Sequence, residues 1–212
     1  GLPVVSEPII PASTDCTTAA HKHSGLASAQ SPQLKKLAQY EAVCDSAITS
    51  RLSFFAPTPT NTQEALAYAT DVAQQLREFA RYSITPLVFL EPMSDGGRVS
   101  LAQYRAGAYD IALDTYFHAI KQAGITDAMM GTWVPLPEGN LPVWSSVRPD
   151  DFTGCVTKAI TFQKKHFPNS KASIMLDTLT YTEPDNYDDG RAVSLLPYVK
   201  DIPAGLVDSF GL

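Results

Sequence analysis

The sequence alternates between short apolar runs and longer segments in which apolar residues recur with helical spacing. The apolar runs begin near residues 52, 87, 130, 172 and 205, so successive runs start 33 to 43 residues apart. Nearly continuous apolar strands are typical of parallel sheets covered by helices, because both faces of each strand are then buried. The pattern therefore predicts an α/β protein built from consecutive strand–helix units.

Boundary signals assign the individual elements. Asn61 and Glu64 have the spacing of a capping box, Pro149 is placed to begin a helix, and Gly124 suits a left-handed helix end. Strands are expected at 51–56, 86–91, 129–134, 172–177 and 205–210. Helices are expected at 31–47, 61–80, 100–124, 149–166 and 193–199.

A (β/α) barrel of the TIM type and a doubly wound sheet both fit this alternation. The regular spacing favours the barrel, and no glycine-rich phosphate loop follows any of the strands. Five strands are expected, or six if Leu2–Ile10 forms one, whereas a closed barrel needs eight. We therefore expect a partial or truncated barrel. Residues 1–30 would be an N-terminal strand or arm and loop, residues 31–212 the barrel portion, and a further segment or partner chain would complete it.

The composition argues against several classes of protein. The net charge is −6 at pH 7 and no basic run exceeds two residues. Nucleic-acid binding is therefore not expected, because phosphate contacts need clustered positive charge. No stretch approaches the roughly 20 apolar residues that span a bilayer. The chain begins at Gly1 without an initiator Met, which favours a processed, secreted protein located outside the cell.

The cysteine and histidine residues form no recognisable metal or redox motif. Cys16 and Cys44 could pair in an oxidising compartment or could remain reduced. His21 and His23 have metal-like spacing without further ligands nearby, and the acidic segment 183–190 lacks EF-hand spacing. We expect no metal and no cofactor.

Acidic residues close three consecutive predicted strands. Glu91 ends one strand, Glu138 follows the next, and Asp177 ends the third. Because the strand C-termini of a barrel carry its active site, we expect these three carboxyl groups to share one cleft as catalytic groups. Each could instead hold a loop by hydrogen bonds. Asp208 lies within the last predicted strand, where a structural role is expected.

Residues 131–144 contain two Trp, one Glu and one Asn around a proline-rich turn. Trp faces stack on sugar rings, and apolar surroundings can hold a nearby carboxyl group protonated. The alternative is a rigid loop whose Trp residues pack on neighbouring helices. The expected substrate-binding residues are Trp133, Asn140, Trp144, Asp95 and Tyr181.

The strand ends at 90–92, 133–140 and 176–177 resemble those of the (β/α)8 glycoside hydrolases, especially the mannanase-like and related β-glycanases. The resemblance covers roughly residues 50–212 and lies in architecture more than in a strict motif. It implies that Glu138 is the acid/base residue, since it follows the fourth strand if Leu2–Ile10 is the first.

Two features depart from the pattern of these hydrolases. Their acid/base Glu usually comes directly after an Asn, whereas here Pro137 precedes Glu138 and Asn140 comes after it. Their nucleophile is a Glu on the seventh strand, which this chain does not reach. The resemblance therefore implies that residues beyond Leu212, or a partner chain, supply part of the active site.

The expected function is hydrolysis of a β-linked polysaccharide or oligosaccharide by carboxylate acid/base catalysis. The alternative is a non-catalytic carbohydrate-binding or structural barrel. Barrel aldolases need a Lys on a strand and metal-dependent hydrolases usually place several His at strand ends, and the predicted strands show neither. His118 and His166 fall on predicted helices, where a structural role is expected.

Overall fold

The computed structural model describes residues 51–139, 148–177 and 195–211. Its principal strands are β1 (Arg51–Pro57), β2 (Thr85–Glu91), β5 (Thr132–Pro135), β6 (Lys171–Met175) and β7 (Ser209–Gly211). A short hairpin consists of β3 (Met93–Ser94) and β4 (Gly97–Arg98). The helices are α3 (Thr62–Arg81), α4 (Leu101–Ala106), α5 (Asp110–Gln122), α6 (Asp127–Met130), α7 (Pro149–His166) and α9 (Leu196–Val199).

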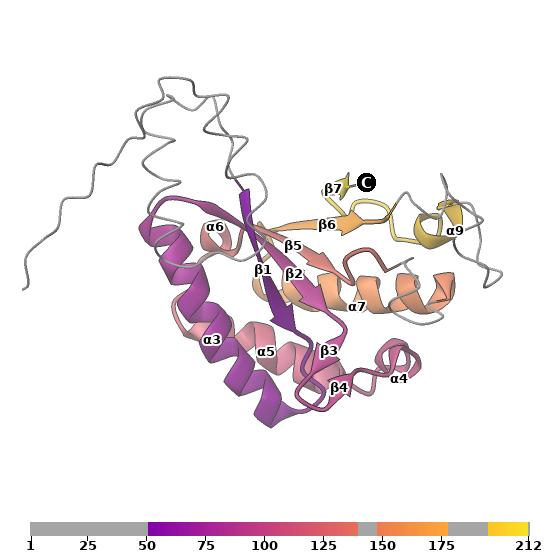
Figure 1. Ribbon diagram of the computed structural model, residues 1–212, viewed down its shortest axis with the longest axis horizontal. Coiled ribbons are helices and arrows are strands. Elements are labelled where there is room, and N and C mark those ends of the chain that lie inside the picture. Colours follow the sequence, from indigo (N-terminus) through magenta and orange to yellow (C-terminus); the bar gives the residue numbers. More distant parts are fainter. Residues whose placement is uncertain (1–50, 140–147, 178–194, 212) are drawn as a thin grey trace, which may run out of the picture.

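The five principal strands form one parallel sheet in the order β1-β2-β5-β6-β7 (Figure 1). The prediction of consecutive parallel strands is confirmed. The strand order follows the chain without the reversal that defines a doubly wound sheet. The sheet is not closed within the described residues, so the structure establishes the α/β class and the parallel sheet but no complete barrel.

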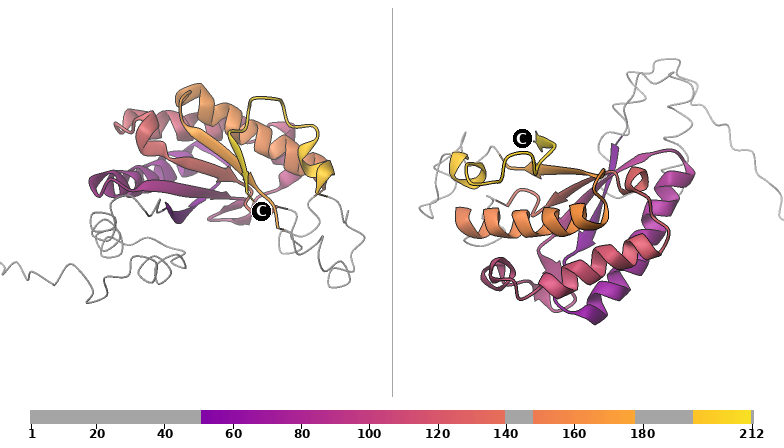
Figure 2. Two further views of the ribbon diagram at one scale, coloured as in Figure 1. Left: turned by 90° about the horizontal axis from the view of Figure 1, so that it is seen from above. Right: turned by 180° about the vertical axis from the view of Figure 1, so that it is seen from behind.

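The long helices α3, α5 and α7 lie side by side on one face of the sheet (Figure 2). Each follows a strand in the chain, and a right-handed crossover places successive helices on the same face when the strand order runs one way. Alternate strand residues point toward this layer and are buried. Examples from the first four principal strands are Phe54, Val88, Leu90, Trp133 and Ile174.

The opposite face of the sheet carries both apolar and hydroxyl side chains, and no helix layer lies on it among the described residues (Figure 2). Phe55 on β1 is 47% exposed. It lies directly beside Phe89 on β2, with the two ring centroids 5.4 Å apart. The sheet thus has one face packed against helices and one face on which the exposed Phe55 lies beside the partly buried Phe89.

Several element boundaries differ from the sequence prediction, and β6 ends at Met175 instead of residue 177. The helix expected at 100–124 divides into α4 and α5, because Gly107 adopts a left-handed conformation with φ of 95° and ends the first helix. Residues 129 and 130 belong to the short helix α6, and β5 begins only at Thr132. The last strand begins at Ser209 instead of residue 205. The expected helix at 31–47 and the expected strand Leu2–Ile10 lie outside the described residues.

Asp208 has the structural surroundings expected of it. Its carboxylate accepts hydrogen bonds from Lys164 Nζ at 2.8 Å and from the backbone N–H of Ala172 at 2.9 Å. Burial acts to raise the pKa of Asp208, but these hydrogen bonds outweigh it and hold the pKa below its usual value. The contacts fasten the chain entering β7 to the start of β6, at the edge where the strands begin.

Candidate active site

The three carboxylate residues predicted as catalytic lie at the edge where the parallel strands end. Glu91 is the last residue of β2, Glu138 lies three residues after β5, and Asp177 lies two residues after β6. These strands are neighbours in the sheet. The structure therefore brings the three chain positions to one edge, which is where parallel β/α proteins bind ligands.

The loop that carries Glu138 is attached to both neighbouring strands. The backbone N–H of Leu136 donates to the carbonyl of Leu90 on β2, and the N–H of Glu138 donates to the carbonyl of Met175 on β6, each at 3.0 Å. Gly139 packs so closely on α7 that an added Cβ would lie 2.5 Å from the ring of Phe152. The loop is thus held between β2, β6 and α7.

Two residues of this loop adopt a left-handed backbone conformation, which is unfavourable for residues other than glycine. Leu136 has φ of 48° and Glu138 has φ of 52°. Each such residue costs on the order of 1 kcal/mol, and such conformations cluster at functional sites. Glu138 is also exposed. The strained turn therefore holds an accessible carboxylate residue above the ends of the strands.

Glu91 lies in a drier environment than Glu138. It alternates with the buried residues of β2, which places it on the same sheet face as Phe89. Partial burial raises the pKa of its carboxyl group above the usual value. A carboxyl group with a raised pKa stays protonated to higher pH than an exposed Glu.

We expect Glu91→Gln to stabilise the protein at neutral pH. The folded protein binds the Glu91 proton more tightly than the unfolded chain, whose Glu pKa is about 4.3. The ionised Glu91 therefore lowers the free energy of unfolding. This loss is absent below the pKa of Glu91 in the unfolded chain, and it grows as the pH rises from that value through the pKa in the folded protein. Urea unfolding at pH 3 and at pH 8 should show a higher free energy of unfolding for Glu91→Gln than for the unsubstituted protein only at pH 8. An equal change at both pH values would contradict the raised pKa.

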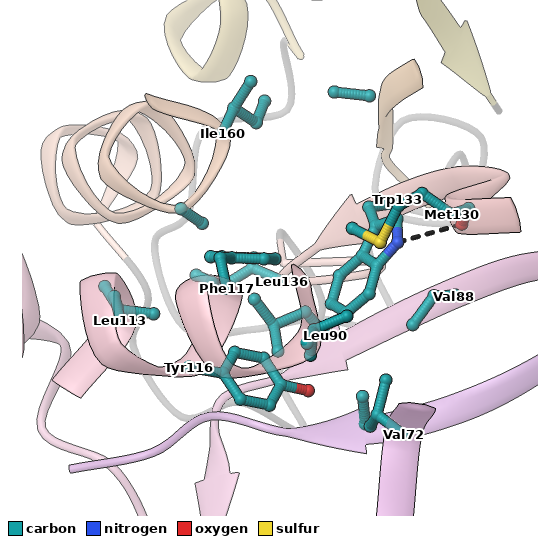
Figure 3. Close-up of a cluster of buried hydrophobic side chains, with 14 of the residues drawn as sticks. Val72, Val88, Leu90, Leu113, Tyr116, Phe117, Met130, Trp133, Leu136 and Ile160 are labelled. Carbon is teal, nitrogen blue, oxygen red and sulfur yellow. Dashed lines mark hydrogen bonds between the residues drawn. The ribbon is translucent and has the colours of Figure 1, made fainter. Parts of the chain in front are cut away.

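Trp133 does not lie where the sequence analysis placed it. The side chain is 1% exposed and points into the core between the sheet and the helices (Figure 3). Its ring contacts Phe117 at a centroid distance of 5.2 Å, and its Nε1 donates to the Met130 carbonyl at 3.0 Å. The indole has no free face for a sugar ring, so the substrate-binding role expected of Trp133 does not fit its position. It packs against helices, as in the alternative interpretation.

The remaining predicted site residues divide into two groups. Asp95 lies in the turn of the β3–β4 hairpin, directly after β2, and is exposed. The following predicted residues and segments lie outside the described residues: Asn140, Trp144, Tyr181, Cys16, Cys44, His21, His23 and 183–190.

A charged cluster between α5 and α7 was not predicted from the sequence. Asp114 accepts hydrogen bonds from Lys165 Nζ at 2.8 Å and pairs with His166 Nε2 at 2.6 Å. The hydrogen bond from Lys165 is the largest cause of a pKa of Asp114 below the usual value. His118 lies against His166, with ring centroids 5.5 Å apart. The cluster links two helices away from the strand ends, which agrees with a structural role for both histidines.

Within residues 51–139, 148–177 and 195–211, no group of three or more His, Cys, Asp or Glu side chains could hold a metal ion. In the same part of the chain, no helix is long and apolar enough to cross a membrane. No protein-family model, curated protein or solved structure significantly matches the sequence or the fold.

Proposed function

We propose that this chain forms part of a (β/α) barrel that hydrolyses a β-linked polysaccharide or oligosaccharide. The observation that carries the proposal is the placement of Glu91, Glu138 and Asp177 at the ends of three neighbouring parallel strands. Glycosidic bonds are cleaved by paired carboxyl groups on either side of the bond, one acting as acid and one as nucleophile or base. An edge that holds several carboxyl groups is suited to this chemistry.

The barrel part of the proposal is supported by the construction of the sheet. Its strands follow the chain order, its long helices share one face, and its other face carries the ring pair Phe55 and Phe89, of which Phe55 is 47% exposed. In a closed barrel that second face becomes the packed interior. Further strands beside β1 and β7 would bury it and would also satisfy the backbone groups at both sheet edges.

We assign Glu138 as the general acid. It is exposed, so a polysaccharide can reach it, and the loop bonds to Leu90 and Met175 fix its backbone. Glu91 lies one strand away, and partial burial raises the pKa of its carboxyl group. Asp177 on the other side would orient substrate hydroxyl groups or serve as the second carboxylate.

The test is an assay of the whole protein that contains this chain. It is incubated with β-mannan, β-glucan and xylan, and the release of reducing ends is measured. We expect hydrolysis of at least one substrate. Binding of oligosaccharides without hydrolysis, detected by titration against Trp fluorescence, would favour the non-catalytic carbohydrate-binding barrel. The absence of both hydrolysis and oligosaccharide binding would overturn the proposal.

A further inference from the structure

The short hairpin that follows β2 is fastened to the end of β1 by one buried residue. Thr58 comes directly after β1 and is 0% exposed. Its hydroxyl donates to the carbonyl of Glu91 at 2.6 Å, and its backbone N–H donates to the carbonyl of Met93 at 2.8 Å. The carbonyl groups on both sides of Pro92 are therefore fixed relative to β1.

The turn of the same hairpin is fastened to α3 by a second buried residue. Tyr68 is 6% exposed, and its phenolic oxygen accepts a hydrogen bond from the backbone N–H of Asp95 at 2.8 Å. Burial is the largest cause of a raised pKa of Tyr68, so the phenol stays neutral throughout the physiological range. A third bond, from the N–H of Val99 to the carbonyl of Pro92 at 3.0 Å, closes the base of the hairpin.

We propose that the hairpin Pro92–Val99 is a fixed wall of the carbohydrate site and that Tyr68 is its positioning residue. This inference rests on the proposed function. The hairpin rises from the edge that carries Glu91, and its exposed Asp95 offers a carboxylate that accepts hydrogen bonds from sugar hydroxyl groups. A wall that is already ordered before binding loses little conformational entropy when the sugar arrives, so it strengthens binding.

The positioning role of Tyr68 is tested by comparing Tyr68→Phe with Tyr116→Phe. Both substitutions remove only a buried phenolic hydroxyl, but the hydroxyl of Tyr116 has no hydrogen-bond partner among the described residues. In Tyr68→Phe we expect amide hydrogen exchange at Asp95, followed by NMR, to accelerate roughly tenfold or more, because the bond that protects this N–H is lost. Exchange at Asp95 should not change in Tyr116→Phe.

Ligand binding is measured on the same variants with mannohexaose, cellohexaose and xylohexaose as probes. We expect Tyr68→Phe and Asp95→Asn each to weaken binding of the preferred probe about tenfold, with Tyr116→Phe unchanged. Unchanged exchange at Asp95 in Tyr68→Phe would overturn the positioning role. Unchanged affinity of Asp95→Asn for the oligosaccharide would show that the hairpin does not contact the sugar through Asp95, and would overturn its role as a binding surface. If the unsubstituted protein binds none of the three probes and hydrolyses none of the three polysaccharides, the proposed function fails and this inference fails with it.

Discussion

Replacing Trp133 by Ala is expected to lower the free energy of unfolding by about 3–5 kcal/mol, as measured by urea denaturation. The indole is among the largest fully buried side chains of the protein. It contacts Tyr116 and Phe117 on α5, so its removal leaves a cavity between the sheet and the helix layer. It also leaves the carbonyl of Met130 without the hydrogen bond from Nε1.

The matched control for this substitution is Phe55→Ala. Phe55 is also an aromatic strand residue, but it lies on the other face of the sheet and is 47% exposed. Its loss removes mainly the ring contact with Phe89 and is expected to cost less than about 1 kcal/mol. A cost below about 1 kcal/mol for Trp133→Ala as well would contradict the core position of the indole.

The alternation of strands and helices was predictable because it depends on local patterns. The Asn61 cap and the apolar face of α3 both appear in the structure as the sequence indicates. The break at Gly107 was missed because a single glycine inside a helical pattern is compatible with either outcome. The face occupied by Trp133 could not be predicted either, since every residue of β5 is buried and the strand shows no alternation.

The details of the candidate site depend on contacts between distant parts of the chain. Thr58 reaches Glu91 across 33 residues, and Tyr68 reaches Asp95 across 27. Neither residue belongs to a motif, so no local pattern singles them out. The common edge of Glu91, Glu138 and Asp177 was predictable, because parallel strands necessarily end at the same side of their sheet.

Replacing Glu138 by Gln is expected to reduce hydrolysis by the whole protein roughly 10²–10⁴-fold, the usual cost of losing a general acid. Gln has nearly the same size as Glu and retains the backbone N–H that donates to Met175, so the loop should keep its structure. Because Glu138 is exposed, its substitution removes no core packing. The thermal midpoint should therefore stay close to that of the unsubstituted protein.

Glu78→Gln provides the matched control, because Glu78 lies on α3, away from the edge where the strands end. Its contact with Arg81, at 3.7 Å, lies on the surface, and its loss should leave the rate unchanged. The most direct test of the central claim is the initial rate of reducing-end release by the unsubstituted protein, Glu138→Gln and Glu78→Gln on one β-glycan. We predict that the initial rate falls at least about 100-fold in Glu138→Gln and stays unchanged in Glu78→Gln. An undiminished rate in folded Glu138→Gln would contradict the account.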